Sequence, residues 1–358
     1  NAILSLTIKR DEPTKTITFL DMLMSQTIED QFNIGFQAEC STGKSYIPLE
    51  IAAYFPSKDI RIYAGASPTS FFHQIGKWRG LADLANEIDL IGLFDSDELS
   101  DEKRKVIFID LEGKILIFMD QPHWMLMEKL RPLLSHDKKM LRYDITDKTG
   151  KGGLRTKTVL IRGYPVVIFA SAKPTQEDQE RTRMWLLSPG IDDQKILESL
   201  RLLGAKISNR EAFRQWVDGH PQRRWLKERI HQIRDTRIIN IVIQDWEKVL
   251  EQFRANRPRL WPRAQRDFPR LLYLIKACAL LNCFNRVKID DKSIIAEQND
   301  IDAAIDLYQT VATSNELGLS PEIYAFYEKV IVPLCQLKNG LSRKEILKQH
   351  WQVYGRPL

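Results

Sequence analysis

Cysteine is scarce in this sequence, and its four cysteines lack the spacing of metal ligands. Cys40, Cys278, Cys283 and Cys335 therefore indicate reduced thiols, and the second and third lie in an apolar helical pattern typical of core residues. The sequence also lacks any apolar run of the roughly 20 residues that cross a bilayer. No signal peptide is recognisable at the start. We therefore expect a cytoplasmic protein with no membrane partner.

Internal repeats and low-complexity tracts are also absent. At 358 residues the chain is too long for one compact core, which predicts two or three domains. The net charge of +6 and the pI near 9 favour a polyanionic partner. The chain starts at Asn1 and stops at Leu358 within a helical pattern, so we expect the ordered part of a longer polypeptide.

The most informative stretch runs from Ala38 to Ser45 and reads Ala-Glu-Cys-Ser-Thr-Gly-Lys-Ser. It follows the apolar run 32–36 and precedes residues 46–54, which have helical spacing. A strand, a tight loop ending in Gly-Lys-Ser and a helix form the context of a phosphate-binding loop. The N–H groups of such a loop and the N-terminus of its helix favour negatively charged phosphates.

The residue types in this loop suit a nucleoside triphosphate. Lys44 is expected to reach the β- and γ-phosphates, and the Ser45 hydroxyl is expected to bind Mg²⁺. The other loop positions assigned to the nucleotide are Ala38, Ser41, Thr42 and Gly43. Ala38 replaces a glycine of the usual pattern, which is tolerable where the residue keeps a negative φ. The alternative is an ordinary strand–turn–helix.

Further apolar runs predict a parallel sheet. Residues 59–65 indicate a second buried strand, and the order strand, helix, strand, helix is typical of parallel strands with crossovers. Residues 95–105 are charged and predict a surface loop. The apolar runs 106–110 and 115–120 flank Glu-Gly-Lys, which predicts a hairpin between them.

Asp120 ends the second of these runs. A carboxylate at the C-terminal end of a central strand can bind Mg²⁺ through water or contact the loop serine; the alternative is a cap for a helix from Pro122. The next residue, where a glutamate base is usual, is Gln121. Because an amide cannot accept a proton, either hydrolysis is slow, Glu39 or Glu128 serves as the base, or Gln121 is a trapping substitution.

Residues 140–163 predict a long hairpin whose tip spans 146–156. Glycines in the tip allow the backbone to approach a partner closely, and its cations suit the phosphates of DNA. The candidate DNA contacts are Lys148, Lys151, Arg155 and Lys157. A merely solvated loop is the alternative.

Two later segments carry candidate nucleotide contacts. The buried strand 165–173 ends near Ser171 and Lys173, either of which can sense a γ-phosphate, although a plain strand exit is the alternative. Arg181 and Arg183 precede another apolar strand and are candidates for a finger that reaches a neighbour's nucleotide. A surface salt-bridging pair is the other interpretation.

Residues 191–263 are predicted to be helical. The spacing of their tryptophans favours helix-packing anchors over base-stacking platforms; these are Trp216, Trp225, Trp246 and Trp261. Arg266 precedes an apolar helix and is a candidate to close over a bound nucleotide. Residues 299–305 predict a capped helix. Ser342 and Glu345 form a capping-box pattern in a C-terminal segment that looks like the first half of a winged helix.

In this order the parts resemble an AAA+ ATPase. A hairpin just before the sensor strand is the mark of the clade that holds minichromosome maintenance (MCM) helicases and viral or plasmid helicases. The lid is similar too, since Arg266 precedes Ala277 and Ala279 by the family's spacing. By position, Arg183 matches the arginine finger, Asp120 the metal-binding aspartate, and the hairpin cations the DNA-translocating hairpin.

The resemblance covers about residues 30–313 and implies an α/β fold. We expect a parallel sheet with helices on both faces, an α-helical lid and a partial C-terminal winged helix. The expected boundaries are a lead-in over 1–31, an ATPase core over 32–190, a lid over 191–313 and the winged helix over 314–358.

The resemblance also implies ATP and Mg²⁺ as cofactors, and a homo-hexameric ring that acts on single-stranded or forked DNA. The implied activity is ATP hydrolysis coupled to DNA translocation, as in replicative helicases of mobile-element or plasmid type. An ATP-dependent assembly switch with slow hydrolysis, such as a loader, transposition regulator or defence scaffold, is the alternative that Gln121 favours. A P-loop ATPase without a nucleic-acid role is a third.

Overall fold

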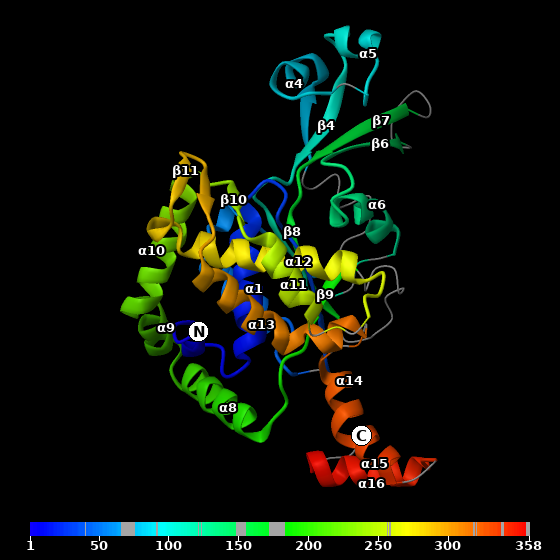
Figure 1. Ribbon diagram of the computed structural model, residues 1–358. Helices are drawn as coiled ribbons and strands as arrows, with labels where there is room; N and C mark the ends of the chain where they lie inside the picture. The colour runs from blue at the N-terminus through cyan, green and yellow to red at the C-terminus, as the bar shows by residue number, and fades with distance from the viewer. Residues whose placement is uncertain are drawn as a thin grey trace.

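In the part of the chain that it describes, a computed structural model contains a five-stranded, a four-stranded and a small three-stranded sheet together with a large helical region (Figure 1). The residues it describes are 1–39, 41–65, 76–90, 92–120, 122, 124–147, 155–171, 183–255, 257, 259–317, 319, 321–337 and 340–355. Within these residues, every helix is too short or too polar to cross a membrane.

The central sheet has five parallel strands in the order β2-β5-β8-β1-β9. They are β1 (Asn33–Gln37), β2 (Ile60–Tyr63), β5 (Ile115–Phe118), β8 (Val166–Ser171) and β9 (Met184–Leu187). Side chains alternate between its two faces. One face packs against α1 (Glu12–Leu23) and α2 (Tyr46–Ala52), and the other against α6 (Trp124–Leu134). The predicted parallel sheet with helices on both faces is confirmed.

The predicted hairpin of residues 106–120 is wrong. Its first half lies in a second sheet, of order β3-β4-β7-β6, made of β3 (Lys77–Gly80), β4 (Lys105–Asp110), β6 (Met140–Asp147) and β7 (Arg155–Arg162). Gly113 does turn the chain, with φ at 69°. The runs on either side are apolar on both faces, and each is buried between two other strands instead of pairing across the turn.

Two smaller predictions are also wrong. The strand at residues 59–65 is not buried: β2 is the edge of its sheet, and Ile62 is 54% exposed. Residues 95–105 include a helix, α5 (Ser96–Ser100), because the Asp95 carboxylate accepts the Glu98 N–H while the Glu98 carboxylate accepts the Asp95 N–H. This reciprocal capping box satisfies backbone groups that an isolated short helix leaves unpaired.

The long hairpin is confirmed where the structure describes it. β6 and β7 pair antiparallel from Met140 opposite Arg162 to Asp147 opposite Arg155. The strands are longer than predicted, and residues 148–154 at the tip lie outside the described residues. Since β8 begins at Val166, only a short link separates the hairpin from the central sheet.

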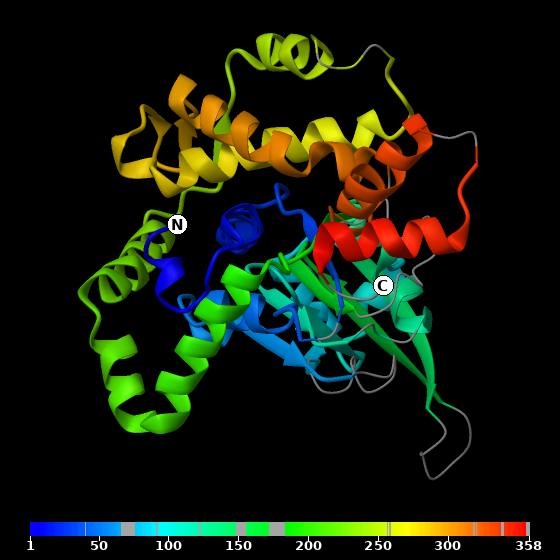
Figure 2. The same ribbon diagram turned by 90° about the horizontal axis from the view of Figure 1, so that it is seen from below.

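The helical region and the central sheet share one apolar core. In Figures 1 and 2, α1 lies between the sheet and the two long helices α12 (Ala264–Leu281) and α13 (Gln298–Glu316). The other elements of this region are α8 (Asp193–Ser208), α9 (Arg210–Gly219), α10 (Pro221–Asp235), α11 (Trp246–Ala255), β10 (Asn240–Val242), β11 (Lys288–Asp290) and β12 (Ser293–Ile295).

The tryptophans of this region are not packing anchors. All four are exposed, by between 46% and 66% of their surface; they are Trp216, Trp225, Trp246 and Trp261. Leucine, isoleucine and valine side chains fill the core instead, for example Ile230 and Val249. Cys278 and Cys283 are core residues, as predicted, and burial raises the pKa of Cys278 to about 12.

The remaining elements are short helices. Leu4–Leu6, Met24–Gln26, Ser57–Asp59 and Cys283–Asn285 are 3₁₀ turns, and α4 (Leu81–Glu87) covers the second sheet. The C-terminal segment contains α14 (Pro321–Phe326), a π-helical turn at Tyr327–Ile331, α15 (Val332–Leu337) and α16 (Arg343–Tyr354). The predicted capping box of Ser342 and Glu345 begins α16.

Candidate nucleotide-binding site

The loop between β1 and α2 turns sharply through two left-handed residues. Ser41 has φ at 66° and Gly43 has φ at 101°. A glycine suits the second position because a Cβ there would be strained, whereas the serine tolerates strain at the first. Left-handed residues of this kind form the concave nests of backbone N–H groups that bind anions. Ala38, at the start of the loop, is buried.

Lys44 folds back into the loop. Its Nζ donates hydrogen bonds to the carbonyl oxygens of Ala38, at 2.7 Å, and Glu39, at 2.9 Å. The side chain is 9% exposed, and in the described part of the chain no carboxylate pairs with it. Two neutral carbonyls leave the ammonium charge uncompensated, so the loop interior favours an anion.

A second lysine, which the sequence analysis did not single out, forms a hydrogen bond with the loop from the helix α8. The Lys195 Nζ, on the first turn of α8, donates to the Thr42 carbonyl at 3.1 Å and to the Gly190 carbonyl at 2.7 Å. It also forms an ion pair of 2.5 Å with Asp11, whose pKa is raised by burial against the opposing effect of this lysine. No local pattern predicts this contact, because its members come from three separate segments.

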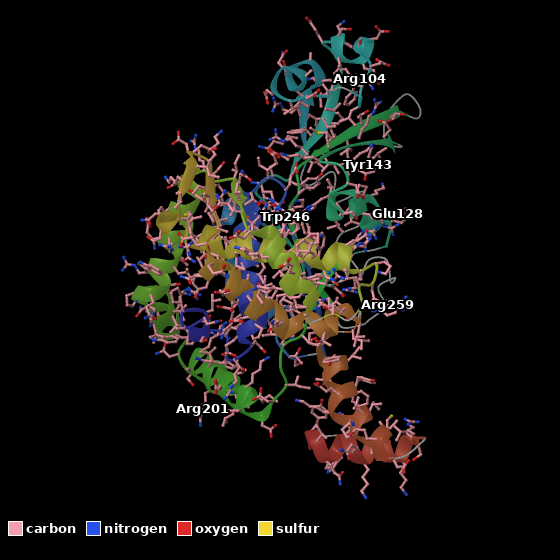
Figure 3. The ribbon with its side chains drawn as sticks, in the orientation of Figure 1. Arg104, Glu128, Tyr143, Arg201, Trp246 and Arg259 are labelled. Atoms are coloured by element: carbon pink, nitrogen blue, oxygen red, sulfur yellow. The ribbon has the colours of Figure 1, made fainter. Side chains whose placement is uncertain are left out.

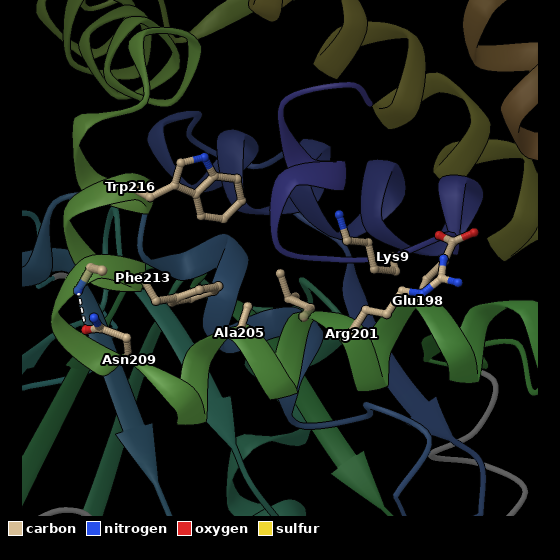
Figure 4. Close-up of a pocket in the computed structure, with 9 residues that line it drawn as sticks. Lys9, Glu198, Arg201, Ala205, Asn209, Phe213 and Trp216 are labelled. Atoms are coloured by element: carbon tan, nitrogen blue, oxygen red, sulfur yellow. Dashed lines mark hydrogen bonds between the residues drawn. The ribbon is translucent and has the colours of Figure 1, made fainter.

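A cavity of about 240 Å³ adjoins the loop. Loop residues line one side, and the chain before α1 and the helix α8 line the others: Thr7, Ile8, Asp11, Ser41, Thr42, Gly43, Tyr46, Ile47, Leu202 and Leu203. A larger hollow of about 560 Å³ lies between Lys9 and the α8–α9 pair (Figure 4). The two share Lys9 and Leu202, so one concave surface leads from the loop along α8. Its apolar lining suits a base or sugar.

Asp120 lies at the same edge of the sheet as the loop. Register places Gln37 of β1 opposite Ser171 of β8, and Phe118 of β5 opposite Phe169. Asp120 comes two residues after Phe118, just past the end of β5, and therefore lies at the same end of the strands as Ser171 and Gln37. Asp120 is exposed there.

The candidate bases occupy different surroundings. Gln121 lies outside the described residues. Glu39 is exposed on the loop, and its carbonyl accepts bonds from Lys44 and Thr42. Glu128 is exposed on α6 (Figure 3). The backbone of Ser171 ends β8 at the same end of the strands as the loop, and its side chain lies outside the described part of the structure.

Of the two candidate arginines, Arg183 lies away from the loop, at the other end of the strands. Arg183 immediately precedes β9 at the amino edge of the sheet, where its Nε donates to the Ser135 Oγ at 2.5 Å. Since β1 has five residues, about 16 Å of strand separates that edge from the loop. Arg266 is exposed on the first turn of α12. Arg181 and Lys173 lie outside the described residues.

The candidate DNA contacts divide between described and undescribed residues. Lys148 and Lys151 lie outside the described part of the chain. Arg155 is the first residue of β7. Lys157 lies two residues further along β7, with its Nζ 5.8 Å from the centre of the Trp78 ring.

No protein-family model matches the chain, and no curated protein matches it. A solved structure titled "SCCmec type IV Cch - active helicase" is similar to it with 12% identity and a TM-score of 0.36. The match covers 93% of this chain and 53% of that one, so this chain spans about half its length. A TM-score this low carries no argument.

A divalent cation at this site needs phosphate oxygens of a bound nucleotide as ligands in addition to protein side chains. Among the described residues, no group of three or more His, Cys, Asp and Glu lies together as a metal site. The Ser45 hydroxyl and the Asp120 carboxylate are hard oxygen ligands of the kind that Mg²⁺ prefers. Phosphate oxygens and water would complete the coordination, as is usual for Mg²⁺ in nucleotide sites.

Proposed function

We propose that this chain is an ATP-hydrolysing motor of the AAA+ type that moves DNA, with ATP and Mg²⁺ bound at the loop of residues 38–45. One observation carries the proposal: an uncompensated buried lysine in a tight loop lies at the same edge of a parallel sheet as Asp120. In open parallel sheets, ligands bind where strand connections diverge at the carboxyl edge, and here that point is between β1 and β8.

The loop residues bind and orient the triphosphate. Lys44 exchanges two neutral carbonyl acceptors for anionic phosphate oxygens, which form stronger charge-assisted hydrogen bonds. Ser45 and Asp120 hold Mg²⁺, directly or through water, and the bound ion neutralises phosphate charge. The base and ribose lie in the hollow between the loop and α8, where Ile8, Tyr46 and Leu203 exclude water.

A neighbouring copy supplies the arginine. Arg183 is at the amino edge of its own sheet, too far away to reach the phosphates that its own loop binds. We therefore place it in the nucleotide site of the next subunit, with Arg266 closing over the bound nucleotide, in a closed homo-hexameric ring. Such an arginine accelerates phosphoryl transfer by on the order of a thousandfold or more.

The hairpin carries the DNA contacts. Lys148, Lys151, Arg155 and Lys157 bind the phosphate backbone in the ring's channel, without regard to sequence. The substrate is single-stranded or forked DNA, and the closest class is a replicative-type, MCM-like helicase of mobile-element or plasmid origin.

ATP binding tests the proposal directly. Lys44→Ala should weaken the binding of a fluorescent ATP analogue by roughly 30-fold or more, because charged hydrogen bonds to phosphate are lost. Lys248→Ala, which removes an exposed lysine of α11 that does not line the hollow, is the matched control and should bind nearly as the parent does. Equal affinity of the Lys44→Ala and parent proteins would overturn the nucleotide site.

DNA binding tests the second part of the proposal, the contact of the hairpin with DNA. Lys151→Glu should weaken DNA affinity and flatten its dependence on salt while it spares ATP affinity, since a phosphate contact is replaced by a repulsive charge. Unchanged DNA affinity would remove the hairpin from the DNA interface.

A second function is favoured by Gln121, which stands where a general base is usual. In that case the ring is an ATP-dependent assembly switch, such as a loader, transposition regulator or defence scaffold, that hydrolyses ATP slowly. Strand displacement at saturating ATP separates the two functions: a motor unwinds a forked duplex, and a switch binds DNA without unwinding it.

A further inference from the structure

An exposed tryptophan lies beside the hairpin, on a strand that the hairpin itself does not include. Trp78 is in β3, the edge strand of the second sheet, and 54% of its surface is exposed. The Lys157 Nζ of β7 lies 5.8 Å from the centre of its ring, within the range of a cation–π contact. A cation at the indole restricts its orientation while more than half of the side chain stays open to solvent.

Strand register places two lysines on the same face of the sheet as Trp78. Trp78 is opposite Ile107, which is opposite Val159. Paired residues share a face, and so do residues two apart in one strand. Lys105, two residues before Ile107, and Lys157, two before Val159, are therefore on the face of Trp78. Lys105 is exposed.

The rest of that face is covered, which confines the open part to one place. Ile107, Val159 and Ile161 are buried against α6, and the Tyr143 hydroxyl donates to the Lys129 carbonyl of the same helix. Among the residues of this face whose side chains the structure describes, the open part consists of Trp78, Lys105 and Lys157. We name these three residues the Trp78 platform.

Asp110 and Asp144 are on the opposite face of the sheet and are already paired, whereas register puts position 147, opposite Arg155 at the end of the hairpin, on the face of Trp78. Asp110 accepts hydrogen bonds from Arg162, and Asp144 accepts one from Thr158. Register puts both carboxylates on the face turned away from Trp78. The Trp78 platform is therefore an aromatic ring with two cations, which complements a base and its neighbouring phosphates.

We propose that the Trp78 platform binds single-stranded DNA, with one base stacked on the indole and the adjoining phosphates at Lys105 and Lys157. The inference rests on the proposed DNA-motor function and names the strand form at the hairpin. A duplex keeps its bases stacked on one another, so the ring adds affinity only for a strand whose bases are unpaired.

The experiment compares two strands that differ only in their bases. Fluorescence anisotropy measures binding of oligothymidylate and of an abasic strand with the same number of phosphates. Trp78→Ala should bind oligothymidylate roughly tenfold more weakly and the abasic strand as the parent does, because stacking is lost and phosphate contacts are kept. Trp78→Phe, which keeps an aromatic face, should retain most of the affinity.

Two controls separate stacking from charge and from general damage. Trp261 is also an exposed tryptophan with a cation beside it, Arg259 at 5.1 Å, and it lies in the helical region; Trp261→Ala should leave both affinities unchanged. Lys105→Ala should weaken the binding of both DNA strands by the same factor and lower the slope of the salt dependence by about one.

The outcomes distinguish this inference from the proposed function. If the parent protein binds neither strand at low salt, the DNA-motor function fails and the platform fails with it. If the parent binds and Trp78→Ala binds oligothymidylate equally well, the platform is wrong while the motor stands. If Trp78→Ala loses affinity equally for oligothymidylate and for the abasic strand, stacking is also overturned, since the ring would then act only by positioning Lys157.

Discussion

Buried charges show how individual residues are held in this chain. Lys15 is fully buried, and its Nζ donates to the Ser5 hydroxyl and the Arg10 carbonyl, so its hydrogen bonds are satisfied. Asp21 is also fully buried, but among the described residues its Oδ1 accepts only a long bond from the Phe32 N–H, at 3.4 Å, and its Oδ2 has no hydrogen-bond partner. A buried carboxylate with so little compensation is costly when ionised.

Asp21→Asn should stabilise the protein at neutral pH. Burial raises the pKa of Asp21 well above its usual value, so the folded state holds a proton that the unfolded state releases. The stability of the parent therefore falls as pH rises from about 4 through the raised pKa, and the variant lacks this loss. We expect a gain of at least about 1 kcal/mol at pH 8 that vanishes near pH 3.8, measured by urea unfolding. A gain independent of pH would contradict this explanation.

Lys195→Met should affect ATP use through the loop that this lysine contacts. The lysine holds the Thr42 carbonyl, so its loss should raise KM for ATP several-fold with a smaller change in kcat. It also leaves Asp11 buried and unpaired, which costs about 3 kcal/mol. The double variant Asp11→Asn, Lys195→Met should regain stability but keep the raised KM. Recovery of both together would mean that Lys195 supports the fold alone.

At the scale of elements, backbone groups of the edge strand β9 form hydrogen bonds with a side chain instead of with another strand. The Asn315 Oδ1 of α13 accepts the Leu186 N–H at 2.8 Å, and its Nδ2 donates to the Leu186 carbonyl at 3.0 Å. Both groups of one strand residue are thus satisfied, as they would be in a strand ladder. Asn315 is 2% exposed, and it anchors the end of α13 to the sheet.

Asn315→Leu should destabilise the protein by about 2 to 5 kcal/mol, because a buried N–H and a buried carbonyl lose their partners together. Asn240→Leu, at an exposed position in β10, is the matched control and should change the free energy of unfolding by no more than about 0.5 kcal/mol. Chemical denaturation measures both. A loss below 1 kcal/mol in Asn315→Leu would mean that water or a neighbouring group replaces the amide.

For the whole molecule, the carboxyl and amino ends of the parallel strands in the central sheet carry different functional groups. The carboxyl edge holds Lys44 and Asp120, and the amino edge holds Arg183. A protein that needs both sets for one reaction has to bring the edges of two copies together. Repetition of such a head-to-tail contact closes into a ring when the rotation permits.

Mixing two inactive variants tests this arrangement. Lys44→Ala and Arg183→Ala should each have little ATPase activity. In an equal mixture, about a quarter of the head-to-tail contacts pair an intact loop with an intact arginine, so activity should return to roughly that fraction of the parent's. A mixture as inactive as its components, with ring assembly confirmed by light scattering, would show that Arg183 acts within its own subunit or not at all.

The local chemistry of the sequence determined the parallel sheet, the tight loop between β1 and α2, the long hairpin and the cap at Ser342. Each depends on a few consecutive residues: an apolar run buried on both faces, a glycine before Lys44, or a hydroxyl three residues before a glutamate. Such patterns act over one turn or one strand, and the tertiary packing of the structure is compatible with each of them.

Only the tertiary structure decided which strands are neighbours and which side chains meet across the chain. Gly113 turns the chain as expected, yet the strands on either side of it lie in separate sheets, each between two other strands. The contact of Lys195 with Thr42 and that of Trp78 with Lys157 join residues distant in sequence. The energy of such contacts comes from burial and register, which no stretch of consecutive residues encodes.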